Sequence, residues 1–234
     1  IAERVPAYLV GPAGTGKSTI AEKAAQALGL EFSSKSCSSQ STESSLLGYM
    51  NAHGDYVGTE FRKRFQHGGV FLLDEVDNGN PNILTVLNSA LANSFMAFPD
   101  GMVARHKDFV LVATANTFGR GGNTEYVGRN AMDAAFLDRF ASVHIGYDEA
   151  IEQVMLDSVG LPTDVAVRFL KAIRKCRANV ESYGLKMVVS PRAVMNGARM
   201  LRHDEFTMRD VLDCVVLRGA NADIAEKVLE GVAL

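Results

Sequence analysis

The stretch Gly11–Thr19 reads GPAGTGKST, and it decides the fold of this chain. It matches the pattern G-x-x-x-x-G-K-[ST] in full. It lies between an apolar run, Pro6–Val10 (PAYLV), and a helix-forming run that is ended by Gly29. A buried strand, a glycine-rich turn and a helix in this order are the setting in which the pattern binds phosphate. The sequence therefore predicts a nucleotide-binding loop at residues 11–19.

Each residue type in this loop suits the holding of phosphate. Glycines let the backbone turn its N–H groups toward phosphate oxygens at the positive end of the following helix. The lysine adds a point charge for the β and γ phosphates, and the serine hydroxyl is placed to ligate Mg²⁺. Kinases, switches and motors share the pattern, so it indicates binding and no particular reaction. The candidate nucleotide-binding residues are Gly11, Pro12, Ala13, Gly14, Thr15, Gly16, Lys17, Ser18 and Thr19.

Short β-type runs alternate with helical patterns up to about residue 147, which is typical of a parallel sheet covered by helices. Four of the five runs are nearly continuous apolar segments, as expected of strands buried on both faces. The predicted fold class is therefore α/β, a P-loop module with a five-stranded parallel sheet between helices. The five runs are Pro6–Val10, Leu30–Ser34, Val70–Asp74, Phe109–Ala115 and Ser142–Gly146.

After Asp148 the β-type runs disappear and helix signals replace them. Ser190 before Pro191 is typical of a helix N-cap with proline at the first helical position, and Thr207 with Asp210 resembles a capping box. The sequence predicts two domains, an α/β nucleotide-binding domain over residues 1–147 and a small all-α lid over residues 148–234. The expected lid helices lie near residues 148–158, 164–182, 191–202, 207–218 and 221–232.

The run VFLLDEVD, Val70–Asp77, delivers two adjacent carboxylates to the end of a predicted buried strand. Ligands of an open α/β sheet lie at the carboxyl ends of its strands. Asp74 is therefore suited to hold hydrated Mg²⁺, and Glu75 to polarise a water for attack on the γ-phosphate. A solvated turn is the alternative for such a pair. A second carboxylate beside the metal ligand favours hydrolysis, and hence an ATPase.

Three further polar residues are candidates for sensing the γ-phosphate. Asn116 follows the apolar run of FVLVATANT, where its amide can reach both the phosphate and the attacking water. Arg139, in DAAFLDRF, lies at a domain edge and suits a finger that reaches a neighbouring subunit, a device worth ~10³ to 10⁵ in rate. Arg129 is a weaker candidate for that task. Arg192, in SPRAVMN, is placed in a first helical turn to read the nucleotide. The alternatives are that Asn116 simply starts a turn, that Arg139 forms a surface salt bridge and that Arg192 faces solvent.

Composition excludes several classes of protein. With 47% apolar and 22% charged residues, the chain is neither disordered nor a disulfide-stapled miniprotein. Its apolar stretches are far shorter than the roughly 18 residues that span a bilayer. A net charge of −3 gives no overall reason to bind nucleic acid. Three widely spaced cysteines indicate reduced thiols and a cytoplasmic location. The start at Ile1, without a leader, indicates a trimmed fragment.

Five segments, GPAGTGKST, VFLLDEVD, ATANT, FLDRF and SPRAV, stand in an order that resembles the AAA+ ATPases. Within them the chain resembles the MoxR-like and CobS-like group, which is kin to the dynein and chelatase motors. Residues 48–61 lie where this group carries an insert, and residues 95–109 are expected to form a hairpin that turns at Pro99–Gly101. The run from Leu87 onward also looks like AAA ATPases encoded by phages and prophages.

The resemblance implies a function: Mg²⁺-dependent ATP hydrolysis by a homo-oligomeric ring, by family habit a hexamer. The ring would remodel a protein client or partner subunit through its two hairpins, as a chaperone or metal-insertion motor. The segment IAERV is all that precedes the first strand, so the residues that contact adenine stay open. The implied roles are phosphate and metal ligands at Lys17, Ser18 and Asp74, base at Glu75, sensor one at Asn116, finger at Arg139 and sensor two at Arg192.

Two other functions stay open from the sequence. A nucleic-acid motor of the clamp-loader or restriction-translocase type needs basic residues in the hairpins, where Arg105, His106 and Lys107 form a small cluster. A nucleotide switch that does not hydrolyse ATP is opposed by the pairing of Glu75 with Asn116. The sequence names neither the client nor the ring size, and it indicates no membrane partner.

Overall fold

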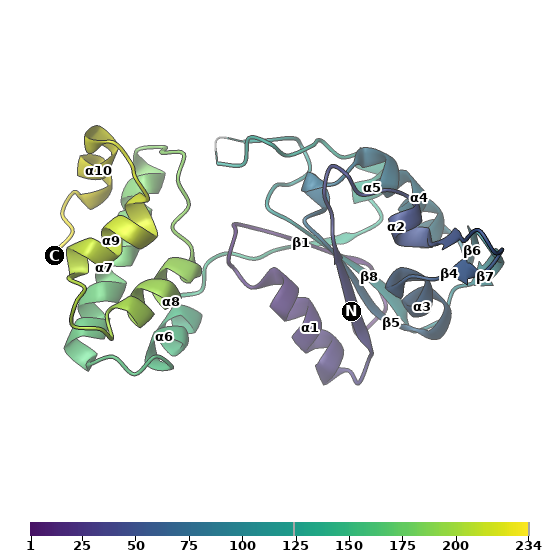
Figure 1. Cartoon of the computed structure of the whole chain (residues 1–234), viewed down its shortest axis with the longest axis horizontal. Coiled ribbons are helices and arrows are strands. Elements are labelled where there is room, and N and C mark those ends of the chain that lie inside the picture. Colours follow the sequence, from purple (N-terminus) through teal and green to yellow (C-terminus); the bar gives the residue numbers. More distant parts are fainter. Residues whose placement is uncertain (124, 234) are drawn as a thin grey trace. The chain divides into compact units, whose positions relative to one another are not determined.

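The structure is a computed structural model, and it describes residues 1–123 and 125–233, apart from the side chains of Pro81 and Asn82 (Figure 1). Contacts divide the chain into two compact units. The first comprises Ile1–Gly11 and Gly16–Ile145, and the second comprises Pro12–Thr15 and Gly146–Leu234. This division falls between residues 145 and 146 and groups the tip of the predicted phosphate loop with the helical unit. The predicted domains, 1–147 and 148–234, stay a prediction.

A five-stranded sheet forms the centre of the first unit, with the strand order β2-β5-β8-β1-β9 (Figure 1). Every pairing in it is parallel. Each of the five predicted runs overlaps one of these strands, and helices follow the sheet along the chain, so the predicted fold class is confirmed. The strands are β1 (Ala7–Val10), β2 (Phe32–Ser36), β5 (Gly69–Asp74), β8 (Phe109–Ala115) and β9 (Ala141–His144).

Burial of these strands follows their position in the sheet. The central strands β1, β5 and β8 are buried almost throughout, as predicted for strands covered on both faces. The prediction is wrong for β9, whose four residues are all exposed, because this strand lies at an edge of the sheet. The other edge strand, β2, is only partly buried.

The helices of the first unit pack on this sheet through two apolar clusters. On one side, Ala21 and Ala25 of α1 pack against the central strands. On the other, the ring centroid of Phe61 lies 5.2 to 6.2 Å from those of Phe65, Phe71, Phe98 and Phe109. The helices are α1 (Lys17–Ala27), α2 (Ser44–Leu47), α3 (Glu60–His67), α4 (Pro81–Ala92) and α5 (Ala134–Leu137), with a 3₁₀ turn at Val76–Asn78.

Two antiparallel hairpins belong to the same unit: β3 (Tyr49–Met50) with β4 (Tyr56–Val57), and β6 (Phe95–Phe98) with β7 (Gly101–Ala104). The second confirms the predicted hairpin and its turn. Arg62 of α3 links the two, because its guanidinium lies 5.2 Å from the ring centroid of Tyr56 and 4.5 Å from that of Phe98. It also donates to Asp100 at 2.6 Å and thereby lowers the pKa of that carboxyl.

The serine-rich segment 33–45 (SSKSCSSQSTESS) has the composition of a flexible surface connection, but part of it is regular structure. Strand β2 continues to Ser36, and α2 begins at Ser44. Between them the N–H of Cys37 donates to the carbonyl of Asp74, and the N–H of Ser38 donates to the hydroxyl of Ser41. Backbone pairing with β5 orders the first part of this segment, residues 33–36, whatever its side chains are.

The second unit is helical in the residues described. Each of its helices overlaps a predicted one, and the predicted helix near 207–218 is an α-helix followed by a π-helix. Ser190 stands at the N-cap of α8 and Pro191 at its start, as predicted, although the Ser190 side chain makes no cap hydrogen bond. The capping box of Thr207 and Asp210 is confirmed. The helices are α6 (Glu149–Asp157), α7 (Thr163–Ser182), α8 (Pro191–Met200), α9 (Met208–Leu212), the π-helix Asp213–Leu217 and α10 (Ala222–Leu229).

A search of the described residues finds no helix with the length and apolar character that crossing a membrane would need.

Helix α8 approaches its neighbours closely at Gly197, which predicts a defined cost for a larger side chain. A Cβ on Gly197 would run into the ring of Phe169 and lie 3.0 Å from Cγ1 of Val211. Gly197→Ala should destabilise the protein by about 1–2 kcal/mol, because overpacking outweighs the gain of about 1 kcal/mol in helix propensity. Urea unfolding followed by circular dichroism measures this. The control is Asn196→Ala, at an exposed neighbouring position, and equal stability of the two variants would contradict the packing argument.

Candidate nucleotide-binding and hydrolysis site

The motif Gly11–Thr19 forms the connection from β1 into α1. Gly14 and Gly16 have φ angles of 83° and 81°, in the left-handed region that favours glycine. Gly11 is needed for another reason, because a Cβ there would collide with the carbonyl oxygen of Ile145. The loop conformation therefore depends on the three glycines of the motif.

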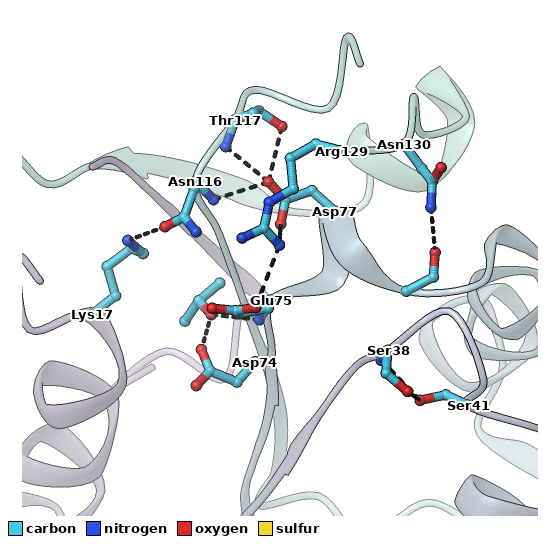
Figure 2. Close-up of polar contacts among 12 residues, drawn as sticks. Lys17, Ser38, Ser41, Asp74, Glu75, Asp77, Asn116, Thr117, Arg129 and Asn130 are labelled. Atoms are coloured by element: carbon cyan, nitrogen blue, oxygen red, sulfur yellow. Dashed lines mark hydrogen bonds and ion pairs between the residues drawn. The ribbon is translucent and has the colours of Figure 1, made fainter. Parts of the chain in front are cut away.

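Lys17 opens α1 with a side chain that is only 8% exposed. Its Nζ donates to the carbonyl of Gly11 at 2.7 Å and to Oδ1 of Asn116 at 3.0 Å (Figure 2). Asn116 directly follows β8, which pairs with β1 in the sheet. The structure thus brings together two of the residues that the sequence singled out, although 98 residues separate them along the chain.

Ser18 and Asp74 place two kinds of hard oxygen ligand side by side. The Ser18 hydroxyl lies 3.0 and 3.1 Å from the two carboxylate oxygens of Asp74, the last residue of β5. A hydroxyl and a carboxylate suit Mg²⁺, which takes few ligands from the protein and completes its shell with phosphate and water. The described residues contain no group of three or more His, Cys, Asp or Glu arranged to hold a metal. These residues therefore fit a magnesium ion.

Glu75 adopts a backbone conformation that is uncommon for a residue with a side chain, with φ 55° and ψ 47°. Its N–H donates to the hydroxyl of Thr114 at 3.1 Å, and the same hydroxyl donates to Asp74. The turn leaves the Glu75 side chain 46% exposed. Backbone strain of this kind costs about 1–3 kcal/mol and is concentrated at functional sites.

Asp77 is a member of the site that the sequence analysis did not single out. Its side chain is fully buried at 0% exposure. Its Oδ2 accepts the N–H of Asn116 at 3.1 Å, the N–H of Thr117 at 3.0 Å and the hydroxyl of Thr117 at 3.0 Å (Figure 2). The available signal was a third acidic residue in VFLLDEVD.

The polar network continues around Asp77. The hydroxyl of Tyr8 donates to the carbonyl of Thr117 at 2.9 Å, and burial, followed by the charge of Asp77, raises the pKa of Tyr8. The N–H of Asn130 donates to the backbone carbonyl of Asp77 at 2.8 Å, and its side-chain amide donates to the carbonyl of Gly79 at 2.9 Å. The loop after β8 is thereby fastened to the turn after β5.

The three candidate arginines lie in different surroundings. Arg139, just after α5, is exposed, and its Nε donates to Oδ1 of Asn88 on α4 at 3.1 Å. Arg129 is only 15% exposed and makes ion pairs within the chain. Arg192 lies in the first turn of α8, in the second unit, and is exposed. Exposure therefore favours Arg139 over Arg129 as a group that could reach a neighbouring subunit.

The buried carboxylate predicts a large effect of Asp77→Ala on stability. The variant leaves the two N–H groups and the Thr117 hydroxyl without their acceptor and takes from Arg129 one of its two carboxylate partners, and removing one partner of a buried ion pair costs about 3–5 kcal/mol. Chemical unfolding measures the loss. The control is Asp138→Ala, at an exposed position of the same unit. A variant as stable as this control would show that the Asp77 network contributes no net stability.

A parallel sheet with a glycine-rich loop after β1, paired acids after β5 and an amide after β8 defines a P-loop nucleotide-binding module. Residues 6–140 match the family described as AAA domain, dynein-related subfamily. This match covers more than half of the chain and includes the loop, Asp74, Glu75, Asn116 and Arg139. The chain therefore belongs to this AAA family, whose members are ATP-hydrolysing P-loop NTPases.

Curated relatives agree with this membership. The chain is 28% identical over 205 residues to the aerobic cobaltochelatase subunit CobS of Sinorhizobium sp, covering 79% of the chain and 61% of CobS. It is 27% identical over 150 residues to uncharacterized proteins of Staphylococcus aureus strains USA300 and NCTC 8325, covering 59% of the chain and 54% of each. The chain spans between half and two thirds of the length of these relatives. The resemblance to AAA+ ATPases of the MoxR-like and CobS-like group is confirmed.

Proposed function

We propose that this chain is a Mg²⁺-dependent ATPase that acts as a homo-oligomeric ring, a hexamer by family habit, and remodels a partner macromolecule. The observation that carries the proposal is the convergence of Lys17, Ser18, Asp74 and Asn116, from three adjacent strands, within hydrogen-bonding distance. Glu75 follows Asp74 directly and presents a half-exposed carboxylate. The groups for phosphate binding, metal binding and water activation thus meet at the carboxyl ends of the strands.

The chemistry follows from these groups. Loop 11–19 and the Lys17 ammonium hold the phosphates of ATP, and Ser18 with Asp74 holds Mg²⁺, which when bound offsets phosphate charge. The Glu75 carboxylate accepts a proton from the attacking water. The Asn116 amide orients that water. Because Lys17 already contacts Asn116, a phosphate that draws the ammonium toward itself also changes the hydrogen bonding of the amide.

Binding and hydrolysis should separate in two variants. Glu75→Gln should keep ATP affinity within about threefold and lower kcat by about 10² to 10⁴, because it loses the base and keeps the loop. Lys17→Ala should weaken ATP binding at least about tenfold and also lose turnover, because the buried charge that faces the phosphates is gone. Calorimetric titration with ATP and a phosphate-release assay with and without Mg²⁺ measure both effects. Glu22→Gln, at a partly exposed position of α1, is the control, and normal hydrolysis by Glu75→Gln would exclude Glu75 as the base.

The ring is supported by the exposure of Arg139, which no described contact ties to the phosphate loop. Specific ATPase activity should fall on dilution, because each site would be completed by a neighbour. Arg139→Ala should lower kcat by ~10³ to 10⁵ and, when mixed with wild-type chain, should lower the activity of the wild type as well. Arg199→Ala, at an exposed position of α8, is the control. Activity that is independent of concentration, with no effect of the variant on the wild type, would exclude the ring.

A protein client or partner subunit is the proposed target. Exposed apolar side chains on the hairpins support this, with Tyr49 53%, Phe95 55% and Met102 63% exposed. CobS is by name one subunit of a cobaltochelatase, which supports a chaperone or metal-insertion role here. The nucleic-acid motor receives less support, because Arg105 of the basic cluster donates to the carbonyls of Ala90 and Leu91 at the end of α4.

Two parts of the proposal concern the rest of the chain. The helical unit is proposed to act as a lid in which Arg192 reads the nucleotide; its place in the first turn of α8 supports this. A cytoplasmic location is proposed as well, and the three cysteines, all free thiols, support it.

A further inference from the structure

The loop between β8 and α5 sends one side chain back into the site. Arg129 NH1 lies 3.3 Å from Oδ1 of Asp77 and 3.4 Å from Oε2 of Glu75 (Figure 2). The arginine therefore bridges a carboxylate with no solvent exposure and a carboxylate that is 46% exposed. Its own side chain is 15% exposed.

The two ion pairs have different consequences. A buried carboxylate needs compensation by charge and hydrogen bonds, so the Asp77 contact fixes where the guanidinium lies. Glu75 is half exposed and its side chain has three rotatable bonds, so solvent alone would leave its carboxylate free to turn. Contact with the Arg129 guanidinium, which Asp77 holds in place, restrains the Glu75 carboxylate. A guanidinium suits this task, because each of its terminal nitrogens carries two N–H groups in a fixed plane, and NH1 of Arg129 donates to both carboxylates.

The same buried carboxylate also fixes the other side of the site. Asp77 accepts the backbone N–H groups of Asn116 and Thr117, so the position of the Asn116 amide depends on it as well. The positions of the Glu75 carboxylate and of the Asn116 amide therefore both depend on Asp77. We propose that Arg129 is a positioning residue for hydrolysis. Asp77 fixes the Arg129 guanidinium, which in turn holds the Glu75 carboxylate in place relative to the Asn116 amide. This inference rests on the proposed function, in which Glu75 activates the water.

The surroundings of Arg129 favour action within its own subunit. The next residue, Asn130, donates its N–H to the carbonyl of Asp77 at 2.8 Å and its side-chain amide to Gly79 at 2.9 Å. These bonds hold the backbone next to Arg129 against the Asp77 turn, and turning the arginine outward to a neighbour would take this cation away from Asp77. Arg129 thus completes a site in cis, whereas Arg139 is exposed.

The first test is a split between kcat and affinity. Arg129→Ala should lower kcat about 10- to 100-fold, since misplacement of a reacting group by about 1 Å has that effect, while ATP affinity changes less than about threefold. Arg129→Lys should retain an intermediate rate, because its single ammonium can neutralise Asp77 but serves both carboxylates poorly. Arg120→Ala, at an exposed position of the same loop, is the control. A wild-type kcat in Arg129→Ala would overturn the proposal.

The second test asks whether Arg129 acts through Glu75. In the Glu75→Gln background, adding Arg129→Ala should leave the residual turnover unchanged, because the carboxylate that the arginine positions is already absent. An equal loss in both backgrounds would overturn the proposal and indicate an independent role in folding or phosphate binding. Wild-type turnover by Glu75→Gln itself would contradict the proposed function, and this outcome is distinct from the other two.

The third test separates action in cis from action in trans. Chains carrying Arg129→Ala are mixed with chains carrying Glu75→Gln. If both residues serve the same site, every site in the mixture is defective and activity stays low. Recovery of activity on mixing would show that Arg129 completes a neighbour's site, and would overturn the proposal.

Discussion

The buried carboxylate of Asp77 is the interaction on which the geometry of the site depends. A charge without solvent exposure is tolerated only when hydrogen bonds and an opposite charge compensate it. Asn116 and Thr117, which follow β8, and Arg129, from the loop beyond, supply that compensation. Three chain segments are thereby held at one point, and each carries or touches a residue of the proposed hydrolytic machinery.

Sheet register explains why the remaining groups meet beside this point. Leu73 of β5 lies opposite Ala113 of β8, so the next residues along, Asp74 and Thr114, are neighbours and share a hydrogen bond. Strand β8 also pairs with β1, which leads into the phosphate loop. Because parallel strands end at the same edge, three strands that are distant in sequence place their terminal polar residues together.

The parts of the site that the sequence could predict are those that follow an apolar run. The loop 11–19, the pair Asp74 and Glu75, and Asn116 each stand directly after a buried strand, and chain order alone places them at one sheet edge. Asp77 and Arg129 could not be found in this way. Asp77 matters because it accepts hydrogen bonds from the N–H groups of Asn116 and Thr117, which lie 39 and 40 positions further along the chain. Arg129 lies in a polar loop that shows no periodicity.

The burial of one edge strand and the extent of the other could not be predicted from the sequence, for a related reason. The apolar run at Ser142–Gly146 has the pattern of a buried strand, but strand order decides its burial, and order depends on which strands pair. At the other edge, Ser33–Ser36 has the composition of a loop and is nevertheless a strand, because it pairs with β5. Local composition predicts whether a segment can be a strand, whereas its burial is a property of the assembled sheet.

The strained turn at Glu75 connects the core of the protein to the proposed chemistry. The residue after it, Val76, is fully buried, and the next, Asp77, is fixed by its hydrogen bonds. Burial of an aliphatic side chain contributes about 1.5–3 kcal/mol, which is enough to offset a left-handed residue at about 1–3 kcal/mol. The packing of Val76 and Asp77 therefore fixes the backbone from which the Glu75 side chain extends. In the proposed ring, groups fixed in this way would complete a site from within one subunit, whereas the exposed Arg139 would be available to a neighbour.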